Sequence, residues 1–215
     1  MLPDSTAKLE YSYESSNAGC AHAYLLPAVK HLVNAFAKNG KILDLGCGNG
    51  SLSHELSKDG HRVCGMDQSY SGIQIAQNSF PNVEFVFGDV EKDLSPHPFK
   101  IGSFDIVLST EVVEHLYQPS KLIQNAFRLL KPSGHFIIST PYHGYLKNLV
   151  LALTGNMDRH FTALWDGGHI KFWSRQTLSV LLTRAGFTDV QFLGTGRLPY
   201  LWKSMILIAR KPRVD

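Results

Sequence analysis

The stretch KILDLGCGNGSL, from Lys41 to Leu52, runs from an apolar strand-like segment straight into three glycines at alternate positions. Glycines placed after a strand let the backbone turn sharply and approach a ligand closely, because no Cβ stands in the way. The helical pattern that follows would present its N-terminus to that ligand, which favours negative charge. Gly46, Gly48 and Gly50 have the spacing G-x-G-x-G, whereas dinucleotide sites need G-x-G-x-x-G, so a pyrophosphate cofactor is disfavoured. A glycine turn without a ligand remains the simpler alternative.

Apolar periodicity on both sides of this stretch predicts strands that alternate with helices. Strands separated by helices of this length form a parallel sheet that is covered on both faces. The first expected helix contains Pro27, where it should begin or kink. The predicted strands are 41–47, 61–67, 83–89, 104–110 and 135–141, and the predicted helices are 22–37, 51–58, 69–80 and 120–134.

The alternation of short elements stops after residue 141. Residues 142–172 form a long segment rich in histidine, aromatic residues and glycine, and a connection of this length inside a compact domain is usually functional. A helix with Ser174 as its N-cap follows, and two strands over 188–196 and 204–212 leave no room for a helix between them, so they should pair antiparallel. The chain is therefore expected to form one domain in four parts. These are an N-terminal cap and helix (1–40), a core (41–141), an insertion (142–173) and a C-terminal helix with a strand pair (174–215).

The composition is that of a globular protein, with 44% hydrophobic and 18% charged residues among 215. The formal net charge of +3 comes from scattered Lys and Arg, so nucleic acid is not expected as a partner. No apolar window reaches the roughly 18 residues of a membrane span, and the polar N-terminus lacks a secretory pattern, so a cytoplasmic protein is expected. Cys20, Cys47 and Cys64 lack metal-finger spacing, which favours reduced thiols over a zinc site. The oligomeric state stays open.

Four motifs resemble those of the class I S-adenosylmethionine-dependent methyltransferases. They are LDLGCGNG, the acid Asp67 in CGMDQS, the acid Asp89 in FGDVE, and FDIVLSTEVVEHL, and together they cover residues 41–141. The resemblance implies a doubly wound α/β fold of Rossmann type, with a mostly parallel seven-stranded sheet, an antiparallel last strand and, here, an insertion after the fifth strand. It also implies S-adenosylmethionine as the cofactor and S-adenosylhomocysteine as the product.

The resemblance also assigns the contacts to the cofactor. Asp44 and the glycine loop would hold the methionine part, and Asp67 would accept hydrogen bonds from both ribose hydroxyls, which suits the two oxygens of a carboxylate. Asp89 with Val90 would contact adenine, although Asp93 lies close enough to Asp89 in the chain to be confused with it. An ordinary strand-end turn is the competing role for Asp67. The complete implied set is Asp44, Gly46, Cys47, Gly48, Asp67, Gln68, Asp89, Val90 and Ser109.

The segment TEVVEHL, at the end of the fourth predicted strand, carries the candidate chemistry. Methyl transfer from a sulfonium mainly asks a protein to position a nucleophile in line and to remove its proton. Glu111, Glu114 and His115 would share one face if a helix begins there. Acids in a first helical turn can instead simply complement the helix dipole. His115 is the preferred base, since the reference pKa of histidine, about 6.5, suits neutral pH.

The segments STEVVEHLYQP, LKPSGHFIISTP and GHIKFWS resemble the branch that contains the ubiquinone-biosynthesis O-methyltransferases. That branch methylates phenolic hydroxyls of small molecules, and its glutamates and histidine have been proposed to hold a divalent cation. A cation would help to ionise a phenol, but three positions with unknown rotamers do not define a site, so no metal ligand is assigned and a divalent cation stays the lesser alternative. An amine is the alternative acceptor, because it needs only a neutral lone pair.

The insertion is expected to cover the acceptor pocket as a lid, with aromatic side chains that shape a slot for a ring. His169, in GGHIKF, is the candidate to act there, because flanking glycines can bring its backbone close to a ligand. The apolar run LVLALTG, residues 149–155, could form a buried helix, a lipid-tail groove or a membrane-touching surface. Tyr11 and Tyr13 are expected to close over the cofactor, with disorder as the alternative.

The sequence thus predicts a methyltransferase that acts on a hydroxyl, or with less support an amine, of a small aromatic molecule. The predicted catalytic residues are His115, Glu111, Glu114 and His169. Two alternatives stay open: a methyltransferase that acts on protein or RNA, and a catalytically silent module that binds the cofactor for regulation.

Overall fold

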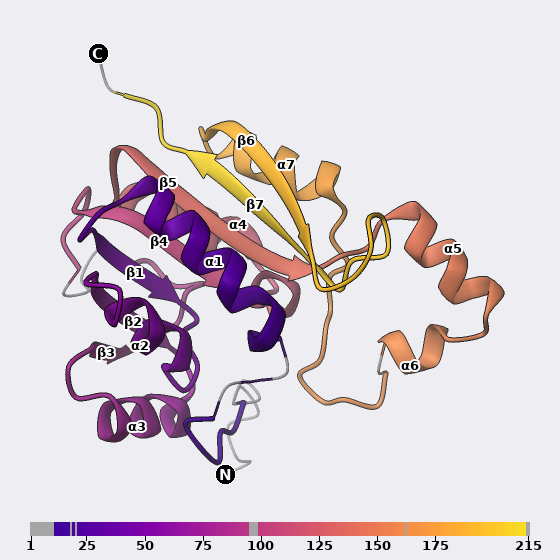
Figure 1. Ribbon diagram of the computed structural model, residues 1–215, viewed down its shortest axis with the longest axis horizontal. Helices are drawn as coiled ribbons and strands as arrows, with labels where there is room; N and C mark the ends of the chain where they lie inside the picture. Colours follow the sequence, from indigo (N-terminus) through magenta and orange to yellow (C-terminus); the bar gives the residue numbers. More distant parts are fainter. Residues whose placement is uncertain (1–10, 18, 20, 95–98, 162, 214–215) are drawn as a thin grey trace, which may run out of the picture.

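The computed structural model describes residues 11–17, 19, 21–94, 99–161 and 163–213. Its centre is a seven-stranded sheet with the strand order β3-β2-β1-β4-β5-β7-β6 (Figure 1). The strands β1 to β5 pair in parallel, whereas β7 runs antiparallel to both of its neighbours. This arrangement confirms the predicted doubly wound sheet with its antiparallel end. The strands are β1 (Lys41–Leu45), β2 (Arg62–Asp67), β3 (Glu84–Phe87), β4 (Phe104–Thr110), β5 (Leu130–Pro141), β6 (Thr188–Thr195) and β7 (Ser204–Arg210).

Helices cover both faces of the sheet, because successive side chains of each buried strand point to opposite faces. In β1, Ile42 belongs to the hydrophobic cluster under α1, α2 and α3, whereas Leu43 and Leu45 belong to the cluster under α4 and α7. Figure 1 shows α1 in front of the sheet and α4 behind it. These helices are α1 (His22–Phe36), α2 (Ser51–Ser57), α3 (Tyr70–Ser79), α4 (Pro119–Leu129) and α7 (Arg175–Arg184).

One helix boundary differs clearly from the sequence prediction. The helix expected over 120–134 ends at Leu129, and β5 begins at Leu130. Pro132 has no N–H with which to continue a helix, and Ser133 takes a φ of 65°, so the chain enters the sheet earlier than the periodicity indicated. Helix α1 begins at His22, where the predicted range 22–37 also begins, and it contains Pro27 in its interior.

The insertion, residues 142–173, connects β5 to α7 and contains α5 (Tyr145–Leu153) and α6 (Met157–Phe161). Both helices project from the body of the molecule beyond the carboxyl end of β5 (Figure 1). The chain then returns to the end of β4, where the backbone N–H groups of Ile170 and Lys171 donate to the Glu114 carbonyl at 2.9 and 3.0 Å. No helix among the described residues is both long enough and apolar enough to cross a membrane.

Candidate active site

The glycine loop turns the chain from β1 into α2. Gly46, Gly48 and Gly50 have φ angles of 85°, 54° and 78°, which side chains with a Cβ rarely adopt. A Cβ on Gly46 would collide with Val112, and one on Gly50 would lie 2.6 Å from the ring of Phe85. The three glycines are therefore required by both the backbone and the packing.

Asp67, the last residue of β2, faces this loop across the carboxyl end of the sheet. Its carboxylate accepts hydrogen bonds from the backbone N–H groups of Gly48 and Ser69, both at 2.7 Å. Asp44, in β1, lies behind the loop with 1% of its surface exposed, and its Oδ2 accepts a 2.7 Å hydrogen bond from the Ser53 hydroxyl. Burial raises the pKa of Asp44 to about 7, against the partial compensation of the Ser53 hydrogen bond.

A cavity of about 1410 Å³ opens over the carboxyl ends of β1, β2 and β4. This volume exceeds the range of about 300 to 1,000 Å³ that is usual for one drug-sized ligand, so there is space for two molecules side by side. Its wall combines the N-terminal segment, the glycine loop, the turn after β4 and the end of the insertion. The predicted site residues that line it are Gly46, Cys47, Gly48, Asp67, Gln68, Val90, Glu111, Glu114, His115 and His169.

Three of the predicted cofactor residues lie outside this lining. Asp44 is buried behind the loop. Ser109 is buried in β4, where its hydroxyl donates to the Leu45 carbonyl at 2.8 Å. Thr110, the next residue of β4, lines the cavity instead of Ser109. Asp89 closes a turn by accepting a 2.9 Å hydrogen bond from the Glu91 N–H. Asp93, which could be confused with Asp89 in the sequence, instead pairs with Arg128 at the surface.

The N-terminal segment lies across the glycine loop. The amide of Asn49 donates to the carbonyls of Ser15 and Asn17, both at 2.8 Å, and the Ser69 hydroxyl donates to the Tyr11 carbonyl at 2.6 Å. The Tyr13 ring sits where a Cβ on Gly48 would be. Burial, and then the charge of Asp67, raise the pKa of the Tyr13 phenol well above its usual range.

The prediction that Glu111, Glu114 and His115 share a helical face is wrong. A single 3₁₀ turn, η1 (Val113–His115), follows β4, and Glu111 precedes it with a φ of 55°. This left-handed backbone aims the Glu111 carboxylate at β5 and β7, where it accepts hydrogen bonds from the Ser139 and Ser204 hydroxyls at 2.8 and 3.1 Å. Burial raises the pKa of Glu111 to about 7.

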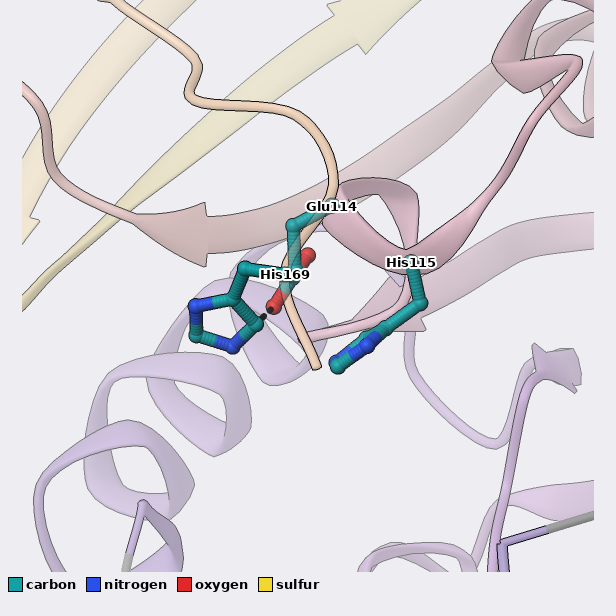
Figure 2. A group of neighbouring side chains, drawn as sticks. All are labelled: Glu114, His115 and His169. Carbon is teal, nitrogen blue, oxygen red and sulfur yellow. Dashed lines mark ion pairs between the residues drawn. The ribbon is translucent and has the colours of Figure 1, made fainter. Parts of the chain in front are cut away.

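The structure instead brings Glu114, His115 and His169 together, as Figure 2 shows. Glu114 has 1% of its surface exposed, and neither of its carboxylate oxygens has a hydrogen-bond partner among the described residues. The Nε2 atom of His169 lies 4.0 Å from Glu114 Oε1. Burial raises the pKa of Glu114 well above its usual range and lowers that of His169 to about 4, so both side chains favour their neutral forms at neutral pH.

One carboxylate and two imidazoles are also suitable ligands for a divalent cation, and one ligand atom from each lies within 4.8 Å of the others. The ligand set implied by the resemblance differs, since it includes Glu111, whose carboxylate is directed to two serines. The glycine pattern around His169 was the sequence signal for its place in the site, whereas nothing in the local sequence separates Glu111 from Glu114.

His115 is held by the returning end of the insertion. Its Nδ1 atom lies 3.0 Å from the Gly167 carbonyl and 3.2 Å from the Gly168 carbonyl. A carbonyl oxygen can only accept a hydrogen bond, so Nδ1 carries the proton of the neutral ring. In this tautomer Nε2 carries no proton, so its lone pair can accept one.

Two further residues of the wall were missed by the sequence analysis. Tyr24, in the first turns of α1, and Lys203, just before β7, line the cavity, and the Lys203 Nζ lies 5.1 Å from the centre of the Tyr24 ring. The Tyr24 hydroxyl is 3.2 Å from the Ser204 hydroxyl, which itself donates to Glu111. Only the antiparallel end of the sheet brings these residues to the cavity, so local sequence carries no signal for them.

A family model described as a methyltransferase domain matches residues 21–192. The chain belongs to this family. Membership of this family implies S-adenosylmethionine as the cofactor, and the residues fit it, with a carboxylate at the end of β2 beside a glycine loop whose Gly46 and Gly48 line the cavity.

Known proteins resemble the methyltransferase over different lengths. The ubiquinone biosynthesis O-methyltransferase of Yersinia pestis (strain Pestoides F) is 31% identical over 119 residues, which are 54% of this chain and 48% of that protein. The match thus spans about half the length of each chain.

Two solved structures share the fold at low sequence identity. Phosphoethanolamine N-methyltransferase 2 of Haemonchus contortus, in complex with S-adenosyl-L-methionine, has a TM-score of 0.65 at 16% identity over 88% of this chain and 52% of that one. The [4+2]-cyclase SpnF has a TM-score of 0.71 at 17% identity over 95% and 88%. The fold alone therefore does not decide the acceptor or even the reaction, which must be argued from the site.

Proposed function

We propose that the methyltransferase transfers the methyl group to a hydroxyl of a small aromatic molecule, with His115 as the base that removes the hydroxyl proton. The cofactor, when bound, supplies a methyl group that its positive sulfur already activates. The chain itself then has to hold the cofactor, align the acceptor and take up one proton. The observation that carries the proposal is the pair of carbonyls that fixes the tautomer of His115.

The cofactor half of the cavity is formed by the glycine loop, Asp67 and Val90. In the proposal, Asp67 accepts hydrogen bonds from the ribose hydroxyls, because the N–H groups of Gly48 and Ser69 orient its carboxylate and a carboxylate oxygen can accept more than one hydrogen bond. Asp44 supports the loop from behind and makes no direct contact with the cofactor. The Tyr13 ring covers this half.

The acceptor half lies between η1, α1 and the returning end of the insertion. The ring of Trp165 lies 5.6 Å from the ring of His115 and 6.3 Å from that of Tyr11, so it bridges the insertion and the N-terminal segment over the cavity. Tyr24 and Leu25 add aromatic and apolar surface from α1. In the proposal the insertion serves as the lid of this half, and these side chains hold the ring of the acceptor while Nε2 of His115 meets its hydroxyl.

The variant His115→Asn tests the base. An asparagine amide can still donate to the two glycine carbonyls but has no basic nitrogen, so we expect turnover to fall by roughly 10² to 10⁴-fold. Affinity for S-adenosylhomocysteine should stay within about twofold, since Asp67 and the glycine loop are unchanged. His31→Asn, at an exposed position of α1, is the matched control. If His115→Asn turned over any accepted substrate at the wild-type rate, His115 would not be the base.

An amine is the second candidate acceptor. An amine needs only a neutral lone pair, and Nε2 of His115 would take up its proton as it would that of a hydroxyl. A panel of matched phenols and aryl amines with a methyl-labelled cofactor separates the two classes. Label found only in added protein or RNA would refute both small-molecule acceptors and favour a methyltransferase that acts on protein or RNA.

A further inference from the structure

One lysine lines the cavity without a partner of opposite charge. Lys203, just before β7, is the only lysine or arginine among the described residues that line it. Its Nζ atom forms no ion pair within the part of the chain that the structure describes, and it lies 5.1 Å from the centre of the Tyr24 ring. An ammonium group has three N–H donors and no acceptor, so a negatively charged oxygen is its strongest hydrogen-bond partner.

The backbone of Lys203 is held on both sides. Its N–H donates to the Thr195 carbonyl at 2.9 Å, which closes the link between β6 and β7. Its carbonyl accepts hydrogen bonds from the Tyr142 N–H at 3.0 Å and from the Lys147 Nζ at 3.4 Å. The side chain of Lys203 therefore starts from a fixed point, where β6, β7 and the start of the insertion meet.

Close packing around Gly196, the residue after β6, directs the Lys203 side chain toward α1. Gly196 has a φ of 92°, and a Cβ on it would lie 2.9 Å from the Lys203 Cβ and 3.1 Å from the Tyr24 ring. The Thr195 hydroxyl also donates to the Tyr24 carbonyl at 2.9 Å, which ties the end of β6 to α1. Only a glycine lets the chain pass this closely, so the approach of Lys203 to Tyr24 is built into the fold.

The acids of the same wall do not compensate the charge of Lys203. Burial raises the pKa of Glu111 to about 7 and that of Glu114 well above its usual range, so neither is a fully ionised partner at neutral pH. Glu14 and Asp166, both exposed, line the wall as well and would repel a group with two negative charges more strongly than a group with one. A carboxylate therefore fits beside Lys203 better than a phosphate does.

We propose that Lys203 pairs with a carboxylate group on the acceptor and thereby selects aromatic acids as substrates. The inference rests on the proposed transfer to a small aromatic molecule, because that molecule carries the carboxylate. Tyr24 and Leu25 line the cavity from α1, so a ring can pack on them while its acid group reaches the ammonium group over Tyr24. The methionine part of the cofactor is the other source of a carboxylate, but in the proposed arrangement the glycine loop and Asp67 hold the cofactor in the other half of the cavity.

Equilibrium binding to the full chain, saturated with S-adenosylhomocysteine, tests the proposal by calorimetry. The probes are the three ring isomers of hydroxyphenylacetate and the corresponding hydroxyphenylacetamides, which have nearly the same shape and no charge. We expect the wild-type protein to bind at least one acid about tenfold or more tightly than its amide, the effect of a hydrogen bond between charged groups. This preference should shrink at about 0.5 M salt, because salt screens the charge of Lys203.

Three variants assign the preference to Lys203. Lys203→Met keeps an apolar stem of similar length but has no charge, so the preference for the acid should fall to about twofold or less while the affinity for the amide stays within about twofold. Lys203→Arg should keep most of the preference, because a guanidinium group also pairs with a carboxylate. Lys38→Met, at an exposed lysine, is the matched control and should behave like the wild type. All variants should keep their affinity for S-adenosylhomocysteine, which also shows that they are folded.

Three results would overturn the proposal. They are a wild-type protein that binds no acid more tightly than its amide, an unchanged preference in Lys203→Met, and a loss of S-adenosylhomocysteine affinity in Lys203→Met without a change in the preference. The last result would assign Lys203 to the carboxylate of the cofactor. Binding does not require methyl transfer, so acids that bind through Lys203 and are never methylated would confirm the carboxylate site and contradict the proposed function alone.

Discussion

Among single residues, Asp67 joins the end of β2 to the glycine loop in the cofactor site. It ends β2, and its carboxylate bonds to the N–H of Gly48 on the neighbouring strand's loop. The geometry thus gives a physical reason for the motif, because loop and carboxylate orient each other.

Replacement of Asp67 should weaken the cofactor site specifically. For Asp67→Ala we expect affinity for S-adenosylhomocysteine to fall by roughly 10- to 100-fold, the effect of losing hydrogen bonds to a charged group. Isothermal titration calorimetry measures it. Asp93→Ala, which removes an exposed acid paired with Arg128, is the control and should bind normally. Equal affinities for the two variants would exclude Asp67 as the ribose acceptor.

The residue scale is also where sequence analysis failed. Glu111 and Glu114 look equivalent in the sequence, yet one turns to Ser139 and Ser204 and the other faces His169. The difference comes from the left-handed backbone at Glu111, which a non-glycine residue adopts only where tertiary contacts impose it. No local pattern encodes those contacts.

Among the elements, the insertion contributes to the site because its last residues contact the turn that follows β4. Its length and its glycines could be recognised in the sequence, and His169 could be singled out. The bonds from Ile170 and Lys171 to the Glu114 carbonyl could not, because they join a loop to a 3₁₀ turn far away in the chain. These bonds explain why the insertion can supply both the aromatic cover and the carbonyls that orient His115.

Trp165 tests the role of the insertion in acceptor choice. Trp165→Ala should raise the KM for aromatic acceptors by roughly 5- to 50-fold, since it removes a large ring from the acceptor wall. Affinity for S-adenosylhomocysteine should change little. Leu164→Ala is the adjacent control, because Leu164 is fully exposed at 101%. The idea fails if the KM is unchanged for every acceptor while cofactor affinity drops.

The start of α7 offers a test of a purely structural element. Ser174 accepts a hydrogen bond from the Thr177 N–H at 3.2 Å, and the Thr177 hydroxyl accepts one from the Ser174 N–H at 3.0 Å, so the two form a capping box. Ser174→Ala should cost about 1 kcal/mol and lower the Tm by roughly 2 to 4 °C. Ser179→Ala, inside the same helix, should leave the Tm unchanged or slightly higher. Equal shifts in calorimetry would show that the cap contributes nothing.

At the scale of the whole molecule, the sheet was predictable because its signals are local. Apolar strands, glycine stops and helical periodicity follow one another from residue 41 to residue 141, and buried parallel strands demand cover on both faces. The antiparallel end followed from the short link between β6 and β7. The part of the cavity wall formed by Tyr24 and Lys203 was not predictable, since these residues are far apart in the chain and come together only in the folded sheet.

Buried acids should make the stability of the whole domain depend on pH. Folding raises the pKa of Asp44 from 3.8 to about 7, so the folded state binds its proton more tightly than the unfolded state. The resulting contribution to stability is complete below about pH 4 and is lost as the pH rises toward 7, by an amount on the order of 4 kcal/mol. Asp44→Asn cannot titrate and should avoid this loss.

Urea unfolding of wild type and Asp44→Asn at several pH values measures the effect. The stability of the variant relative to the wild type should increase from about pH 4 to 7 and then level off. Asp93→Asn, at the exposed acid, should show no comparable trend over this range. A difference between Asp44→Asn and wild type that is constant over the range would mean that Asp44 is already ionised in the folded protein.

The glycine loop and Asp67 are expected to form the site for S-adenosylmethionine. Calorimetric titration of the full chain with S-adenosylhomocysteine, and separately with NAD, tests it most directly. We expect micromolar binding of S-adenosylhomocysteine with one site per chain and no measurable binding of NAD. Binding of NAD in its place, or of neither ligand by a folded protein, would show that the glycine loop and Asp67 do not form a site for S-adenosylmethionine.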